Sequence, residues 1–165
     1  MPARKTVKVG DVLSIPIVDG LCATAQVLVK RAILHVVIFS ELRQCGSISI
    51  EAETSSSPVL AGWTMDAKVY HGYWEIIGKS MPADWSDLKK NYKVEYAGKI
   101  WVEDFDGRLL HPASRSEIEN LFNRSSYSPA SLEQAIRAFH KLEPWDSKFD
   151  DLLIPKSNSE NTMPN

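Results

Sequence analysis

The stretch DVLSIPIVDGLCATAQVLV, residues 11–29, carries the strongest structural signal in the chain. Apolar residues occupy every second position from 13 to 17, which is typical of a β-strand with one apolar face. The Asp19-Gly20 pair that follows predicts a two-residue hairpin turn, because glycine tolerates the positive φ that such turns require. Pro16 cannot donate a ladder hydrogen bond, so we expect this strand to lie at a sheet edge or to contain a bulge.

The pattern continues as β through the first two-thirds of the chain. Further segments with alternating, β-branched or aromatic residues are expected to be strands and cover residues 23–29, 32–39, 47–53, 59–70, 73–77 and 93–105. Asp106-Gly107 indicates a second hairpin. Residues 82–91 are expected to form a loop with one helical turn.

The last third of the chain has a helical period instead. Ser114 and Glu117 have the spacing of a capping box, and Ser128 followed by Pro129 is typical of a helix start. Aromatic and apolar residues between 145 and 153 suggest a short docking helix.

The predicted fold is therefore α+β: a strongly bent antiparallel sheet or a small β-barrel, covered by two or three C-terminal helices. We expect residues 1–154 to form a single domain and residues 155–165 a mobile tail.

Composition restricts the class of protein. The 165 residues include 44% apolar and 24% charged residues with a net charge of −2, which excludes general disorder and does not favour a nucleic-acid binder. No apolar run reaches the length of about 20 residues that a membrane helix needs, so no membrane partner is expected. A plain hairpin turning at residues 30–31 would set Cys22 opposite Phe39 and leave Cys45 out of reach, so reduced thiols in a cytoplasmic protein are expected.

The usual signatures of catalysis are missing from the sequence. The two cysteines and four histidines have no metal-site spacing, and there is no nucleophile elbow or phosphate loop, so we expect no metal, no cofactor and no enzyme. One alternative is a small hydrolase that uses His111 with Glu103 or Asp106 as an acid–base pair. Another is a nucleic-acid-binding barrel. The bases of the nucleic acid would stack among basic and aromatic side chains, namely Lys89, Lys90, Tyr92 and Trp101.

Acidic side chains near the C-terminus suggest a protein-binding face. Trp145 lies among Asp146, Asp150 and Asp151, and an aromatic residue flanked by carboxylates suits a hot spot for a basic partner. The alternative is that the aromatic residues pack on the core while the acids face water. A second candidate face has three carboxylates around the predicted turn: Glu103, Asp104 and Asp106.

Several segments in this order resemble one family. They are KVGDVLSIPI (8–17), DGLCATAQVL (19–28), WEIIG (74–78), WVEDFDG (101–107) and SLEQAIR (131–137). Together they resemble the bacterial immunity protein 26 family. The resemblance implies a protein that neutralises a cognate toxin domain, for instance a nuclease, encoded by a neighbouring gene in a polymorphic-toxin or contact-dependent inhibition system. It transfers no catalytic residue.

The residues that carry this resemblance are expected to be structural. Gly10 and Asp11 should open the first strand, Gly78 and Gly107 should permit backbone bends, and two tryptophans, Trp74 and Trp101, should anchor the core.

Overall fold

The computed structural model describes residues 5–155 and has an α+β fold built on two sheets. The strands are β1 (Asp11–Val18), β2 (Leu21–Lys30), β3 (Leu34–Gln44), β4 (Pro58–Thr64), β5 (Glu75–Lys79), β6 (Tyr92–Tyr96), β7 (Lys99–Glu103), β8 (Leu109–Pro112) and β9 (Ser126–Tyr127). The helices are α1 (Ile50–Thr54), α2 (Ala67–Tyr70), α3 (Arg115–Asn120) and α4 (Pro129–Phe139), with 3-10 helices η1 (Ser86–Leu88) and η2 (Ser147–Leu152).

The larger sheet has six strands in the order β5-β1-β2-β3-β4-β9 and the smaller has three in the order β6-β7-β8. All pairings are antiparallel except that of β4 with β9. The six-stranded sheet is open, with β5 and β9 at its edges, so the barrel alternative is wrong and the α+β fold class is confirmed. The predicted tail lies, apart from Pro155, outside the described residues.

The hairpin predicted from the opening stretch forms as expected. Gly20 has a φ of +74°, and the ladder between β1 and β2 closes at the pair Val18 and Leu21. Pro16 is exposed, and the register shifts between it and Val18, so the strand contains the irregularity that proline predicts. β5 pairs only with residues 11–14 of β1, which leaves the proline end of the strand at an edge.

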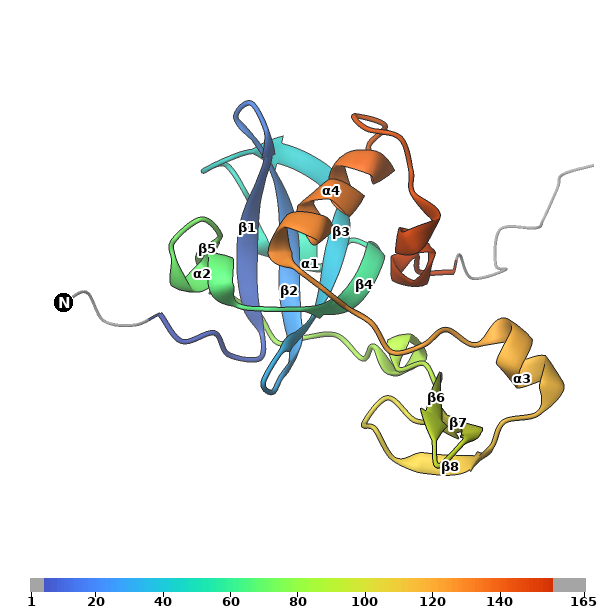
Figure 1. The fold of residues 1–165 in the computed structure, drawn as a ribbon. Coiled ribbons are helices and arrows are strands. Elements are labelled where there is room, and N and C mark those ends of the chain that lie inside the picture. Colours follow the sequence, from blue (N-terminus) through green and yellow to red (C-terminus); the bar gives the residue numbers. More distant parts are fainter. Residues whose placement is uncertain (1–4, 156–165) are drawn as a thin grey trace, which may run out of the picture.

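One face of the six-stranded sheet is covered by helix α4, which lies in front of it in Figure 1. The hydroxyl of Ser128 accepts a hydrogen bond from the amide of Ser131, and Pro129 occupies the first turn, as the sequence predicts. The apolar stripe of the helix is buried against the sheet and comprises Leu132, Ala135 and Ile136. Helix η2 covers the same face farther along β4, through the buried Phe149 and Leu152.

Two of the glycine landmarks, Gly10 and Gly107, have the positive φ of a backbone bend, whereas Gly78 lies within β5 against the side chain of Ile50. Gly10 has a φ of +89° and lies close to the backbone of Ser80. A Cβ atom at position 10 would be 2.7 Å from the carbonyl oxygen of Ser80. Asp11 accepts a hydrogen bond from the Lys8 amide at 2.8 Å. Gly78 lies where the register of β1 and β5 shifts, and Gly107 has a φ of +88° in the turn before β8.

The two tryptophan landmarks differ. Trp74 is fully buried in the main core, and its indole N–H donates to the Glu133 carboxylate at 2.8 Å. Trp101 lies half-buried on β7 in the three-stranded sheet and belongs to none of the core clusters of the described residues. The expectation that Trp101 anchors the core is therefore wrong. Its strand, β7, belongs to the three-stranded sheet, which packs against the main sheet only near the Glu103 end of that strand.

Three of the predicted strands are wrong in detail. In segment 59–70 the strand ends at Thr64, and Ala67–Tyr70 form helix α2. Part of segment 47–53 forms helix α1, because Ser49 caps it through the Ala52 amide and acidic side chains occupy its first turn. Segment 93–105 is split between β6 and β7, because Ala97 and Gly98 both adopt positive φ and form a tight hairpin turn.

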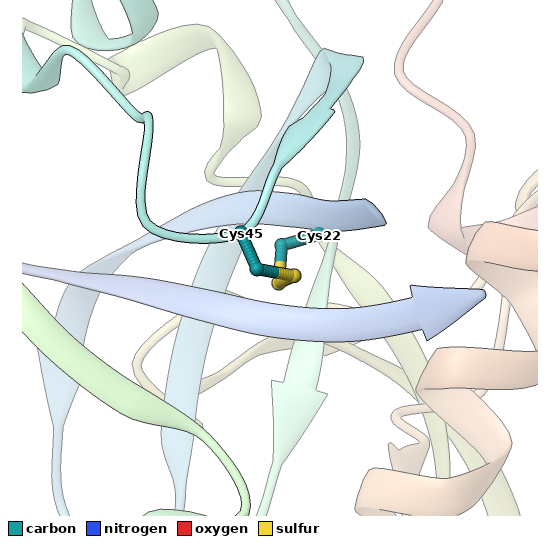
Figure 2. Close-up of a disulfide and its surroundings, with 2 residues drawn as sticks. All are labelled: Cys22 and Cys45. Carbon is teal, nitrogen blue, oxygen red and sulfur yellow. A yellow bond between two sulfur atoms is a disulfide. The ribbon is translucent and has the colours of Figure 1, made fainter. Parts of the chain in front are cut away.

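The expectation of two free thiols is contradicted by a disulfide between Cys22 and Cys45 (Figure 2). The turn between β2 and β3 spans three residues, and two register shifts along the ladder place Cys22 opposite Arg43. Cys45 then lies two positions beyond Arg43, where its amide donates to the carbonyl of Gly20 at 2.9 Å. The two Cα atoms are 5.1 Å apart, within disulfide reach. The assumption of a regular hairpin produced the error.

Candidate partner-binding surface

The three-stranded sheet and helix α3 form a lobe beside the main sheet, at the lower right of Figure 1, which we call the β6–β8 lobe. Its β7–β8 turn is closed by Asp104, whose backbone and side chain both bond to the backbone of Arg108 at 2.9 Å. Helix α3 begins with the predicted capping box, in which Ser114 and Glu117 satisfy each other's amides. The lobe is thus built from local sequence signals.

An aromatic cluster fixes the lobe to the main sheet. The indole of Trp63, on β4, donates to the hydroxyl of Tyr92 at 3.3 Å and stacks on Phe105 with ring centroids 5.1 Å apart. The guanidinium of Arg124 lies 4.5 Å from the centre of the Tyr92 ring and pairs with the buried Glu103 at 2.9 Å. These contacts hold the lobe in one orientation.

A second tie joins the tip of the lobe to the main sheet. Arg31, in the turn between β2 and β3, pairs with Asp106 at 2.5 Å, and this guanidinium lowers the pKa of the Asp106 carboxyl. Because both side chains are about half exposed, solvent screens the pair and we assign it a positioning role.

Apolar side chains lie exposed on the outer part of the lobe. Strand β8, along the bottom of the lobe in Figure 1, is exposed at all four residues, with Leu109 at 41% and Leu110 at 48%. β8 is also an edge strand, with a sheet neighbour only on the β7 side among residues 5–155. Tyr96 and Ile100, on the other two strands, are exposed as well. An apolar edge of this kind is open to pairing with another chain.

The C-terminal acidic face is largely occupied by local hydrogen bonds. Asp150 accepts from the indole N–H of Trp145 at 2.8 Å, and Asp146 accepts from the Lys148 amide at 3.0 Å. Asp151 is buried and accepts from the hydroxyl of Tyr127. Trp145 itself packs against the main core, so this segment fits the alternative of docked aromatics better than that of an open hot spot.

The hydrolase alternative requires side chains that the fold does not bring together. His111 is exposed and lies 2.9 Å from Glu117, whose pKa is lowered first by the Ser114 amide and then by this contact. Glu103 bonds to Arg124, and Asp106 bonds to Arg31. Each candidate therefore has a separate partner, and neither predicted pair, His111 with Glu103 or His111 with Asp106, forms.

The nucleic-acid alternative lacks accessible rings. Tyr92 is buried, with Arg124 over its face, and Trp101 is half-buried. The ammonium group of Lys90 bonds to the carbonyl oxygen of Asp151, while Lys89 lies beside a cavity described below. A base could not stack on Tyr92 without displacing that guanidinium.

Two further features are absent from residues 5–155. These residues contain no group of three or more His, Cys, Asp or Glu side chains placed to hold a metal ion. No helix among them is long and apolar enough to cross a membrane.

Sequence reasoning missed the exposed apolar edge at β8: Leu109 and Leu110 were not among the candidate site residues. The signal that could have found it is their adjacency, since neighbouring strand residues point to opposite faces and a thin sheet cannot bury both. No family model, curated protein or solved structure matches the chain. The resemblance to the immunity protein 26 family therefore rests on the quoted segments alone.

Proposed function

We propose that this protein works by binding another protein, as an immunity protein that neutralises a cognate bacterial toxin domain. The observation that carries the proposal is the exposed edge strand β8 with Leu109 and Leu110 on a firmly attached lobe. The toxin itself, encoded by a neighbouring gene, is an inference from the family resemblance.

Leaving the leucines of β8 exposed to water costs free energy. Leu109 and Leu110 are 41% and 48% exposed, so each forfeits only part of the roughly 1.5–3 kcal/mol that full burial of its side chain would contribute. Natural sheets protect their edges with charges, proline, bulges or a covering segment. β8 has Pro112 and a register shift, yet its two leucines stay exposed. A partner strand or apolar ridge could bury the leucines and bond to free backbone groups of β8.

Tight attachment of the lobe favours binding as well. The cluster of Trp63, Tyr92 and Phe105 fixes the strand before any partner arrives, so little conformational entropy is lost on docking. The carboxylates of Asp104 and Asp106 lie at the same hairpin and would add a polar rim.

The proposal does not depend on a cytoplasmic location. A disulfide such as Cys22–Cys45 is typical of oxidising compartments, so the location expected from the cysteine count has lost its basis.

The test is co-expression with the C-terminal domain of the protein encoded by the neighbouring gene, followed by co-purification, growth rescue and a titration by calorimetry. We expect a complex, and we expect Leu109→Asp and Leu110→Asp each to weaken it by at least about tenfold, because a carboxylate would be buried at the interface. Leu142→Asp is the matched control, since Leu142 is 49% exposed and follows helix α4, outside the lobe. It should bind like the wild type.

Two results would contradict this proposal. Growth rescue without any complex would remove binding as the mechanism. A complex that tolerates both β8 variants but is weakened by Asp146→Lys would place the interface on the C-terminal acidic segment instead.

A further inference from the structure

A cavity of about 220 Å³ lies between the main sheet, the segment around η1 and the start of the β7–β8 turn. Its walls are mostly apolar and are formed by Leu28, Val29, Pro82, Ala83, Leu88 and Phe105. The cavity lies beside the aromatic cluster, and β8 is not among its walls. It is therefore a feature separate from the proposed partner-binding edge.

Two nitrogen atoms of side chains that line this cavity are buried without a hydrogen-bond partner among the described residues: Nδ1 of His35 and Nε1 of Trp85. His35 is only 2% exposed, on the face of β3 opposite to α4. Leaving such a group unsatisfied typically costs about 1–3 kcal/mol. Both atoms can donate, because an indole nitrogen always carries a proton and a neutral imidazole carries one on either nitrogen.

The electrostatic surroundings favour a negatively charged acceptor. Burial, with the nearby charges of Lys90 and Arg124 acting in the same direction, lowers the pKa of His35 to about 4. The imidazole is therefore neutral near pH 7 and lies in a positive field, to which Lys89 on the cavity wall adds. The opposing charge, Asp84, is exposed and accepts from the Ser86 amide at 3.0 Å.

The size and lining of the cavity limit the ligand. An apolar cavity of about 150 Å³ holds one benzene molecule, so this cavity has room for a single ring with a small substituent. Leu28, Leu88 and Phe105 offer apolar contact for the ring. The two unpartnered nitrogens are covered in this structure, so the rings of His35 and Trp85 must turn toward the cavity to donate to the oxygen atoms of a carboxylate.

We propose that this cavity binds a small apolar monocarboxylate of the size of one aromatic ring, with Trp85 and His35 donating hydrogen bonds to its carboxylate. This assignment rests on the cavity and its unsatisfied donors, and it stands whether or not β8 binds a partner. Water molecules alone could also satisfy the two nitrogens, so the experiment must separate a ligand from water.

The experiment is an NMR titration of the ¹⁵N-labelled full chain with benzoate, benzamide and toluene as probes. Among the five tryptophans, the indole signal of Trp85 is assigned by its loss in Trp85→Phe. We expect benzoate to shift that signal and the ring signals of His35 with a millimolar dissociation constant. Benzamide, which lacks the charge, should bind roughly tenfold more weakly, and toluene more weakly still.

Variants test the two donors directly. Trp85→Phe and His35→Phe each keep a ring but remove one donor, and each should weaken benzoate binding roughly tenfold. Trp101→Phe is the matched control, since it makes the same substitution at a half-buried tryptophan outside the cavity, and it should leave the affinity unchanged. Contacts between benzoate protons and Phe105, measured as NOEs in the wild type, test the site without any substitution.

Three outcomes would overturn the proposal. The first is that none of the probes perturbs Trp85 or His35, which would leave a cavity filled by water alone. The second is equal affinity for benzoate and benzamide, which would exclude a carboxylate as the recognised group. The third is benzoate binding with NOEs to another part of the chain.

Discussion

Reduction of the Cys22–Cys45 disulfide is expected to lower the free energy of unfolding by about 3 kcal/mol, because the bond closes a loop between residues 23 positions apart and restricts the unfolded chain. Cys22 is buried on β2, whereas Cys45 is exposed just beyond β3. Breaking the bond therefore need not disturb the core. The bridge also holds the end of a hairpin whose ladder is twice irregular, where pairing is weakest.

The measurement is urea unfolding of the wild type with and without a reductant that does not absorb, alongside the Cys45→Ala variant. Reduced wild type and Cys45→Ala should have the same lowered stability, because the exposed position of Cys45 leaves no cavity when its sulfur is removed. A thiol assay of the unfolded, unreduced protein should find no reactive cysteine. Full reactivity in that assay, or identical unfolding curves with and without reductant, would disprove the bridge.

Local signals explain the parts of the fold that were predictable from sequence. Asp19-Gly20 specifies its turn because the backbone there needs positive φ, and neither residue depends on distant contacts. The caps at Ser114 and Ser128 likewise need only residues three positions away. Features of this kind can be read from a single sequence, although the Ala97-Gly98 turn and the Ser49 cap, which are equally local, were missed.

Long-range and irregular features were not predictable in the same way. The Cys22–Cys45 pairing depends on two register shifts in the β2–β3 ladder, and no residue type marks such shifts. A strand such as β8 reads as core until the thickness of its sheet is known. The cavity beside His35 combines residues from β3, from the segment around η1 and from the β7–β8 turn, so it exists only in the folded chain.

The predicted acidic face illustrates a related difficulty. Carboxylates such as Asp150 and Asp151 look free in a sequence, yet each has a hydrogen-bond donor within the fold. Their partners, Trp145 and Tyr127, could not be assigned from spacing, because Tyr127 reaches Asp151 across 24 residues. Charge density alone therefore could not separate a docking face from a hydrogen-bonded segment.

Lowering the pH from above 6.5 to about 4 should remove about 3 kcal/mol of stability through His35 alone. Its pKa is about 4 in the folded protein and 6.5 in an unfolded chain, so between these values the unfolded state binds a proton that the folded state excludes. The contribution is complete above pH 6.5 and is lost progressively as the pH falls toward 4. Burial is the main cause, and the charges of Lys90 and Arg124 act in the same direction.

Comparison with His35→Phe isolates this residue from the other groups that titrate on acidification, among them His140, Asp106 and Glu117. A phenyl ring can take the place of the imidazole between Trp63 and Phe105, each of which has its ring centroid 4.9 Å from that of His35. Urea unfolding should therefore show that the free energy of unfolding falls less in the variant than in the wild type between pH 7 and pH 4. The two losses should differ by about 3 kcal/mol. If both proteins lose the same stability, His35 must accept its proton in the folded state, and the buried neutral imidazole on which the cavity assignment rests would be wrong.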